Sequence, residues 1–154
     1  VLYSIDSTIE FMIPEFRDKW TLAEVKPEDS SELWIFRKNI GASEIKGLKI
    51  APSLIYLTIE YQPKDETGLP NSEDEKLLYD FEDEVAPKLE KEAQCVHVGS
   101  VLKAGVKDLL FYVSDSDFFL KVLNENNQGL ASFEVSLEKY EDPNWGVYED
   151  FPGG

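Results

Sequence analysis

The sequence predicts an α+β fold in which an antiparallel sheet carries two helices on one face and is extended by an additional N-terminal β-hairpin. Three observations predict it: alternating apolar runs that suit strands, two segments with helical apolar spacing, and their order along the chain. From residue 54 onward this order is strand, helix, strand, strand, helix, strand, which is the ferredoxin-like βαββαβ pattern. We expect a single domain over residues 1–154, with a hairpin extension at about 8–39, a core at about 54–139 and a C-terminal acidic aromatic tail at 140–154.

The sequence of the N-terminal part predicts the additional β-hairpin. The segments WTLAEVK (20–26) and ELWIFRKN (32–39) flank PEDSS, a cluster of Pro, Asp and Ser that is typical of a turn. We expect TIEFMI (8–13) as a further short strand and a loop with a local excess of lysine over 39–53. The next segment, LIYLTIEY (54–61), alternates well and is expected as a central or near-central strand.

A long helix follows. Ser72 and Glu75 form a capping-box pattern, so this helix should begin at residue 72. Pro87 falls within the apolar periodicity, where it removes a backbone hydrogen bond and kinks the chain. The sequence therefore predicts one bent helix over about 72–92, or a break near residue 86.

The last elements are a second hairpin, a second helix and a final strand. VHVGSVLKA (96–104) and KDLLFYVS (107–114) form the hairpin, and DSDFFLKVLNENN (115–127) has the helical stripe. ASFEVSLEK (131–139) alternates cleanly and completes the βαββαβ order. Its inward positions are expected to be Ala131, Phe133, Val135 and Leu137.

The charge balance limits the classes of partner. The chain of 154 residues has 31 Asp and Glu against 15 Lys and Arg, for a net charge of −16. Such a field repels phosphate, so we expect neither direct nucleic-acid binding nor docking on an anionic membrane. The default interpretation of this charge is that it serves solubility alone. The functional interpretation, on which the main hypothesis below rests, is a protein partner with a basic surface. A homodimer through a sheet edge or an open sheet face is a further possibility.

The chain has a single cysteine and a single histidine, Cys95 and His97. An internal disulfide is therefore impossible, which fits a reducing compartment, and we expect a cytoplasmic protein. The chain starts at Val1, which leaves a trimmed signal peptide or an upstream domain open. One Cys and one His are too few for a zinc site, so no metal and no cofactor are expected.

Motifs for catalysis are missing from the sequence. There is no Gly-rich phosphate cradle and no Gly-x-Ser-x-Gly elbow, and the one histidine lies in the middle of a predicted strand. The densest carboxylates, in YDFEDE (79–84) and SDSD (114–117), are interpreted as a solvated helix face and a helix cap. We therefore expect no catalytic residues and lean against an enzyme.

The tail YEDPNWGVYEDFPGG (140–154) is acidic and aromatic. Trp145, Tyr148 and Phe151 are three residues apart, so one short helical turn would place their rings on one side. One interpretation is a clasp that seals part of the sheet. The other is a partner site, because Trp and Tyr with a polar rim are good interface anchors. The partner-binding residues of this second hypothesis are Asp142, Trp145 and Tyr148 in the tail, with Glu82 and Asp83 as an acidic patch.

Several motifs resemble one protein family. They are Gly68-Leu69-Pro70 before the long helix, Glu82-Asp83 on it, Gly99 and Gly105 with Asp108 in the hairpin, and Phe111-Tyr112 in its last strand. Over about residues 20–152 the chain resembles the bacterial domain-of-unknown-function family 695, and the ending DPNWGVYEDF is similar to that of the family. The ribonuclease E inhibitor family has a related ending and a ferredoxin-like fold. The resemblance implies the fold and no catalytic residue, and the lysine-containing loop and the N-terminal segment depart from it.

These observations lead to one main hypothesis of function and one alternative. The main hypothesis is a non-catalytic protein-interaction or regulatory module that binds a basic protein partner. The alternative is a small-ligand binding protein or a hydrolase-type enzyme with a cleft lined by carboxylates and by Tyr56, Tyr61 or Tyr112.

Overall fold

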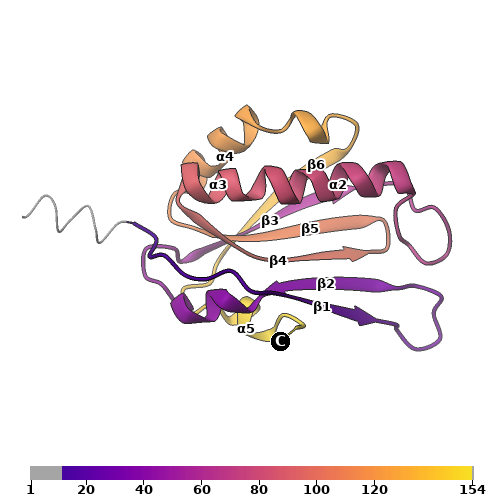
Figure 1. Cartoon of the computed structure of the whole chain (residues 1–154), viewed down its shortest axis with the longest axis horizontal. Coiled ribbons are helices and arrows are strands. Elements are labelled where there is room, and N and C mark those ends of the chain that lie inside the picture. Colours follow the sequence, from indigo (N-terminus) through magenta and orange to yellow (C-terminus); the bar gives the residue numbers. More distant parts are fainter. Residues whose placement is uncertain (1–11, 154) are drawn as a thin grey trace, which may run out of the picture.

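A computed structural model describes residues 12–153 of the chain (Figure 1). It is an α+β structure with one six-stranded antiparallel sheet of order β1-β2-β4-β5-β3-β6. The strands are β1 (Trp20–Val25), β2 (Trp34–Asn39), β3 (Ser53–Glu60), β4 (Cys95–Lys103), β5 (Val106–Val113) and β6 (Glu134–Glu141). The helices are α2 (Ser72–Glu84), α3 (Ala86–Ala93), α4 (Ser116–Glu125) and α5 (Gly146–Asp150), with short 3₁₀ turns η1 (Ile40–Ile45) and η2 (Gln128–Leu130).

One face of the sheet packs against α2, α3 and α4, as Figure 1 shows. Its strand residues follow the period of two that sequence alternation predicts, because successive side chains of a strand point to opposite faces. In β3 and β5 the buried apolar positions on this face are Ile55, Leu57, Ile59, Leu109, Phe111 and Val113. This face holds the larger core, to which the helices contribute Leu78, Phe81, Leu89, Phe119, Val122 and Leu123.

The opposite face has a smaller core of its own. η1 and α5 lie on this side (Figure 1), and the buried strand residues are those of the other parity. They are Leu54, Val96, Val98, Leu110 and Tyr112. Trp145 and Tyr148 from the tail fill the space between these strands and Ala42 and Ala51. Both faces of the central strands β3, β4 and β5 are therefore covered, at least in part.

The long helix breaks at Val85 into α2 and α3, which confirms the second of the two predicted outcomes. Pro87 stands in the first turn of α3, where its missing N–H needs no partner. The N-cap of α2 is Asn71 rather than Ser72, because the Asn71 side chain accepts the backbone N–H of Asp74 at 2.8 Å. The helix begins at Ser72, as the sequence predicted, but its cap is Asn71 and not the pair Ser72 and Glu75.

Three other expectations need correction. β6 begins at Glu134 instead of residue 131, because the chain after α4 first makes the turn η2. The loop at 39–53 contains η1. Of the strand expected at 8–13, residues 8–11 lie outside the described residues, and Met12 and Ile13 form no strand. Apart from these corrections, the sheet has six strands where a simple ferredoxin arrangement has four, because β1 and β2 pair with each other and β2 pairs with β4.

Candidate functional site

An open cleft of about 400 Å³ lies on the second face of the sheet, beside α5. Strands β5, β3 and β6 supply its floor, because Thr58 is directly opposite both Asp108 and Ser136, and Tyr56 is opposite Glu138. Its lining residues are Tyr56, Thr58, Val106, Asp108, Glu138, Tyr140 and Val147. Two of them are carboxylates, two are tyrosines, and none is basic.

The two tyrosines of the cleft form one aromatic corner. The rings of Tyr56 and Tyr140 meet edge to face, with centroids 5.6 Å apart and an interplanar angle of 86°. Tyr140 is 49% exposed and donates its hydroxyl hydrogen bond to Glu138. Burial raises the pKa of Tyr56, and the nearby carboxylates Asp108, Asp142 and Glu138 raise it further. Both phenols are therefore neutral near pH 7 and present aromatic faces beside negative charge.

Asp108 is the half-buried carboxylate of the cleft. It accepts a hydrogen bond of 2.6 Å from the Thr58 hydroxyl. Burial raises the pKa of Asp108 and Glu138 adds to the rise, whereas the Thr58 hydrogen bond and Lys103 oppose it. A cation placed here would relieve the repulsion between the two carboxylates and would also contact the tyrosine rings. The cleft therefore has the chemistry of a site for a cationic group.

The C-terminal tail forms one wall of the cleft and is held by a network of hydrogen bonds. Tyr112 donates to Asp142 at 2.7 Å and accepts the backbone N–H of Tyr148 at 3.2 Å. Asp142 in turn accepts the backbone N–H groups of Gly146 and Val147, each at 3.0 Å, and so caps α5. This network fixes Val147, the tail residue that lines the cleft.

The aromatic rings of the tail point inward. Trp145 is fully buried, stacks on Tyr112 with centroids 4.1 Å apart, and donates its indole N–H to the carbonyl of Ala51 at 2.9 Å. Tyr148 is also buried and donates its hydroxyl to the carbonyl of Asn39 at 2.7 Å. The tail has the contacts of the clasp interpretation, and neither ring offers surface to a partner in this conformation.

The five residues of the partner-site hypothesis are not brought together. Trp145 and Tyr148 are buried on the second face, where Asp142 is half-exposed. Glu82 and Asp83 are on α2, which covers the opposite face. Glu82 is buried, and only Asp83 is fully on the surface. The expected acidic patch is therefore reduced to one exposed carboxylate.

Glu82 belongs instead to a buried charge cluster between α2 and the sheet. Its Oε1 lies 2.5 Å from Lys107 Nζ and 3.1 Å from Arg37 Nη1, and its Oε2 lies 3.8 Å from His97 Nε2. Burial alone would raise the pKa of Glu82, but Lys107, His97 and Arg37 outweigh burial and hold it at about 2. Burial also lowers the pKa of His97 to about 4, so this imidazole is neutral near pH 7. The Glu82 charge is thus balanced by Lys107 and Arg37.

Sequence reasoning named Tyr56 for a cleft of this kind, together with Tyr61 and Tyr112, which do not line it. It missed Lys107 and the cleft carboxylates Asp108 and Glu138, although a signal existed for each. Lys107 has the same strand parity as Leu109 and Phe111, which are buried, so it had to face the helices. Tyr56, Asp108 and Glu138 share the other parity of their strands. What the sequence does not give is which strands are neighbours, and the cleft exists only because β3 lies between β5 and β6.

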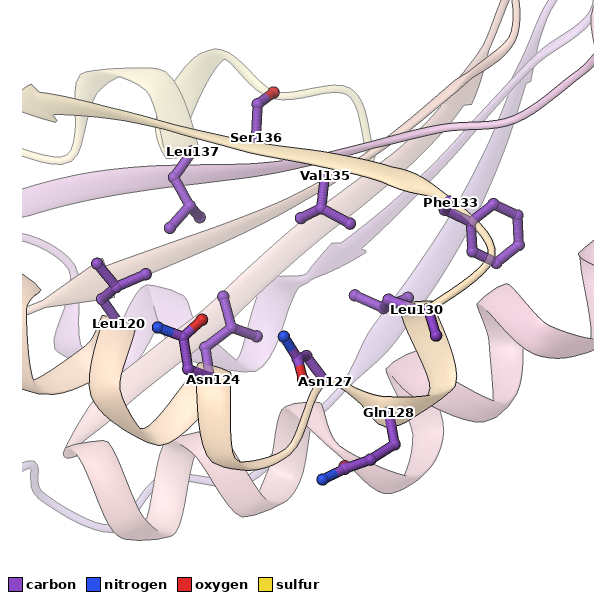
Figure 2. A pocket seen from close by; sticks show the side chains of 11 residues that line it. Leu120, Asn124, Asn127, Gln128, Leu130, Phe133, Val135, Ser136 and Leu137 are labelled. Atoms are coloured by element: carbon purple, nitrogen blue, oxygen red, sulfur yellow. The ribbon is translucent and has the colours of Figure 1, made fainter.

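A second, larger cavity of about 680 Å³ lies on the helix side of the sheet, between β6 and the segment formed by α4 and η2. Figure 2 shows Val135 and Leu137 pointing from β6 toward this segment, whereas Ser136 points to the other side. The lining is mostly apolar and includes Leu120, Leu130 and Phe133, with the amides of Asn124 and Asn127. β6 therefore separates an acidic cleft from an apolar cavity.

Other kinds of site have little support in the part of the chain that the structure describes. Within residues 12–153 no group of three or more His, Cys, Asp or Glu side chains is arranged to hold a metal ion. Burial raises the pKa of the Cys95 thiol, which leaves it unreactive near pH 7. None of the helices in the described segment has both the length and the apolar character of a membrane span.

Comparison with known proteins identifies the family. The model of a family of unknown function, DUF695, matches residues 18–151. This match covers most of the chain, so the chain belongs to that family, as the motifs in its sequence indicated. No curated protein and no solved structure matches it.

Proposed function

We propose that the protein is a non-catalytic interaction module whose acidic cleft binds a basic segment of a protein partner. The observation that carries this proposal is the lining of the cleft, in which Tyr56 and Tyr140 stand beside Asp108 and Glu138 without a basic side chain. The net charge of −16 strengthens it, because a negative field attracts a basic partner over several ångströms.

A lysine or arginine side chain suits this lining for two reasons. Its cationic head can lie over a tyrosine ring, which attracts cations through its quadrupole. The same head can donate charge-assisted hydrogen bonds to Asp108 and Glu138, which are shorter and stronger than those between neutral groups. Because Asp108 is only half exposed, water screens its charge less than it screens a fully exposed carboxylate.

The test is binding of a basic peptide by fluorescence anisotropy, with an acidic peptide of equal length as control. We expect the basic peptide alone to bind, with an affinity that falls steeply between about 0.05 M and about 0.5 M salt. Asp108→Asn and Glu138→Gln keep the shape of each side chain and remove its charge. Each should weaken binding by about tenfold, since a hydrogen bond to a charged group is worth about 1.5–3 kcal/mol. Glu92→Gln, on the exposed side of α3, is the matched control.

A basic peptide that binds equally well at high salt, or equally well to all four proteins, would contradict the proposal. If the basic peptide binds as expected, a lysate capture that compares the wild type with Asp108→Asn, after nuclease treatment, serves to identify the partner. The nuclease step removes proteins that are bridged by nucleic acid.

One observation favours a second function for the same cleft. Asp108 has a raised pKa and a directional hydrogen bond from Thr58, and perturbed carboxyl groups in clefts are common in small-ligand sites and in acid–base catalysis. This alternative is a small-ligand binding protein or a hydrolase-type enzyme. A rise in the melting temperature with small cationic amines, or turnover of a chromogenic ester or glycoside that Asp108→Asn abolishes, would favour it.

The proposal also includes a ferredoxin-like core within a single domain. The order β6-β3-β5-β4, with α2 and α3 between β3 and β4 and α4 between β5 and β6, supports it. The antiparallel pair β1 and β2 would then be an extension that joins this core at β4. A cytoplasmic location is proposed from the buried, free thiol of Cys95.

A further inference from the structure

We infer that β6 is a docking edge, to which the basic partner adds an antiparallel strand with alternating apolar and basic side chains. The inference rests on the proposed function and deepens it, since it states the conformation and sequence pattern of the partner segment. Strand addition of this kind takes its affinity from main-chain hydrogen bonds and its specificity from pockets for alternate side chains.

The first argument is the free backbone of β6. Within residues 12–153 this strand pairs on one side only, with β3. The backbone N–H of Asp142 donates to the carbonyl of Pro52 at 2.8 Å, in register with the ladder. Hydrogen-bonded pairs alternate along an antiparallel ladder, so the N–H groups of Val135, Leu137 and Lys139 point away from β3. These donors face outward along the open edge.

The second argument is the different chemistry of the two sides of β6. Val135 and Leu137 line the apolar cavity under α4, and Glu138 and Tyr140 line the acidic cleft. A residue placed opposite an outward-facing position of β6 has its side chain on the same side of the sheet as that position. An added strand would therefore send every second side chain to the apolar cavity and the others toward the carboxylates.

The third argument is exposed apolar surface. Val135 is 42% exposed and Leu120, across the cavity on α4, is 40% exposed. A group of exposed apolar side chains is a stronger sign of an interaction site than one exposed apolar side chain by itself. An apolar side chain of the added strand would bury both.

Charge selects the partner against a second copy of this chain. β6 carries Glu134, Glu138 and Glu141 against one base, Lys139. Two copies of β6 side by side would bring like charges together, which destabilises a strand pair. A strand with lysine or arginine at the positions that face the cleft would instead place opposite charges beside Glu134 and Glu138. Glu141, on the helix side, lies 3.5 Å from Lys139 of the same strand.

The probe is a short, end-blocked peptide of alternating lysine and valine, titrated into the full chain. Its control has the same residues with the lysines and valines in two blocks, so that the charge is equal and the alternation is lost. We expect the alternating peptide to bind about tenfold more tightly, because only this peptide can place valines against the cavity and lysines against the cleft at the same time.

The edge itself is tested with Lys139→Pro against Lys139→Ala. Both variants lose the same charge, but only proline removes the outward N–H, and proline is tolerated on edge strands. Loss of this hydrogen bond should weaken the alternating peptide by about three- to tenfold relative to Lys139→Ala. Thermal unfolding checks that both variants are folded.

A second measurement uses the wild-type protein, so it does not depend on whether the Lys139 variants fold. In an antiparallel added strand the valine N–H groups face β6 and the lysine N–H groups face away. N-methylation of the valines should therefore abolish binding, whereas N-methylation of the lysines should leave it nearly unchanged.

The outcomes separate the two proposals. Equal binding of the alternating and block peptides, still sensitive to Asp108→Asn, would overturn strand addition and leave the cleft function standing. Tight binding that neither methylated peptide loses would overturn it as well. Failure of every basic peptide to bind would overturn both. Self-association that Lys139→Pro abolishes would replace the basic partner with a second copy.

Discussion

Replacing Glu90 by glutamine should expose a pH dependence of stability that the wild-type protein conceals. The concealed pH dependence is due to His97. Burial lowers the pKa of His97 from 6.5 to about 4; Glu82 opposes this shift, and Lys107 and Arg37 add to it. As the pH falls through this range, the unfolded chain binds a proton that the folded protein refuses. Stability is therefore lost between pH 6.5 and about 4. At about 1.4 kcal/mol per pKa unit, the loss is about 3 kcal/mol.

Glu90 shifts in the opposite direction. Burial raises the pKa of Glu90 from 4.5 to about 7, a hydrogen bond from the His97 backbone opposes this, and Asp18 adds to the rise. Here the folded protein binds a proton that the unfolded chain does not yet bind. Stability is therefore gained as the pH falls from about 7 to 4.5, again by about 3 kcal/mol. Between pH 6.5 and 4.5 the contributions of Glu90 and His97 nearly cancel.

The Glu90→Gln variant removes one of the two opposing groups. Glutamine can still accept the backbone N–H of His97, which lies 3.1 Å from the Glu90 carboxylate. Above pH 7 the variant should be more stable than the wild type by up to about 3 kcal/mol, since a buried charge is gone. Its free energy of unfolding should then fall by about 3 kcal/mol between pH 6.5 and 4, while that of the wild type stays level down to pH 4.5.

The assay is urea denaturation followed by circular dichroism, at fixed ionic strength and at several pH values. Glu92→Gln, at an exposed position of the same helix, is the control and should follow the wild type. Below pH 4.5 all three proteins should lose stability together. In this range the unfolded chain binds a proton at Glu82, whereas the pKa of Glu82 in the folded protein is about 2. A level profile for Glu90→Gln, or a wild type that falls steeply between pH 6.5 and 4.5, would refute the reasoning.

Two further predictions use the same denaturation assay near pH 7. Trp145→Ala should destabilise the protein by about 3–5 kcal/mol, because it leaves a cavity against Tyr112. Tyr112→Phe should cost only about 1–2 kcal/mol, because it loses only the hydrogen bond from the hydroxyl to Asp142. If the tail docks outward, neither variant should change the stability much. Glu82→Leu alone should lower the free energy of unfolding by about 3–5 kcal/mol, because it leaves Lys107 as a buried unpaired charge. Adding Lys107→Met should recover most of the lost stability. A double variant no more stable than Glu82→Leu would count against this pairing.

The α+β class and several strands were predictable because burial of a sheet face imposes a period that the sequence displays. LIYLTIEY alternates well, and the structure places Ile55, Leu57 and Ile59 on the helix face. The start of β6 was harder, since ASFEVSLEK continues the same alternation through residues that the turn η2 keeps out of the sheet. Local pattern does not report where a preceding turn ends.

The candidate site was less predictable, because it depends on which strands are neighbours. Asp108 and Glu138 are far apart in sequence and share the cleft only through β3, which lies between their strands. Glu82 shows the converse difficulty. An acid on a helix is expected in solvent, and it is buried here because Lys107 faces it from the sheet.

The acidic residues of β6 have a general explanation that must be separated from docking, because charges on an edge strand also prevent aggregation. β6 does carry charge on both sides, with Glu134 and Glu138 on the cleft side and Lys139 and Glu141 on the helix side. Protection alone, however, would not leave an apolar side chain exposed on the strand and would apply to both edges of the sheet. β6 instead exposes Val135 on its helix side, and the opposite edge strand, β1, carries Glu24 as its one charge and exposes Leu22. Neither the acidic cleft nor the cavity under α4 touches β1, so a strand added to β1 would reach neither of these two surfaces. At β6 the main-chain hydrogen bonds of an added strand come with two side-chain surfaces of opposite character, and that combination can distinguish one partner sequence from another.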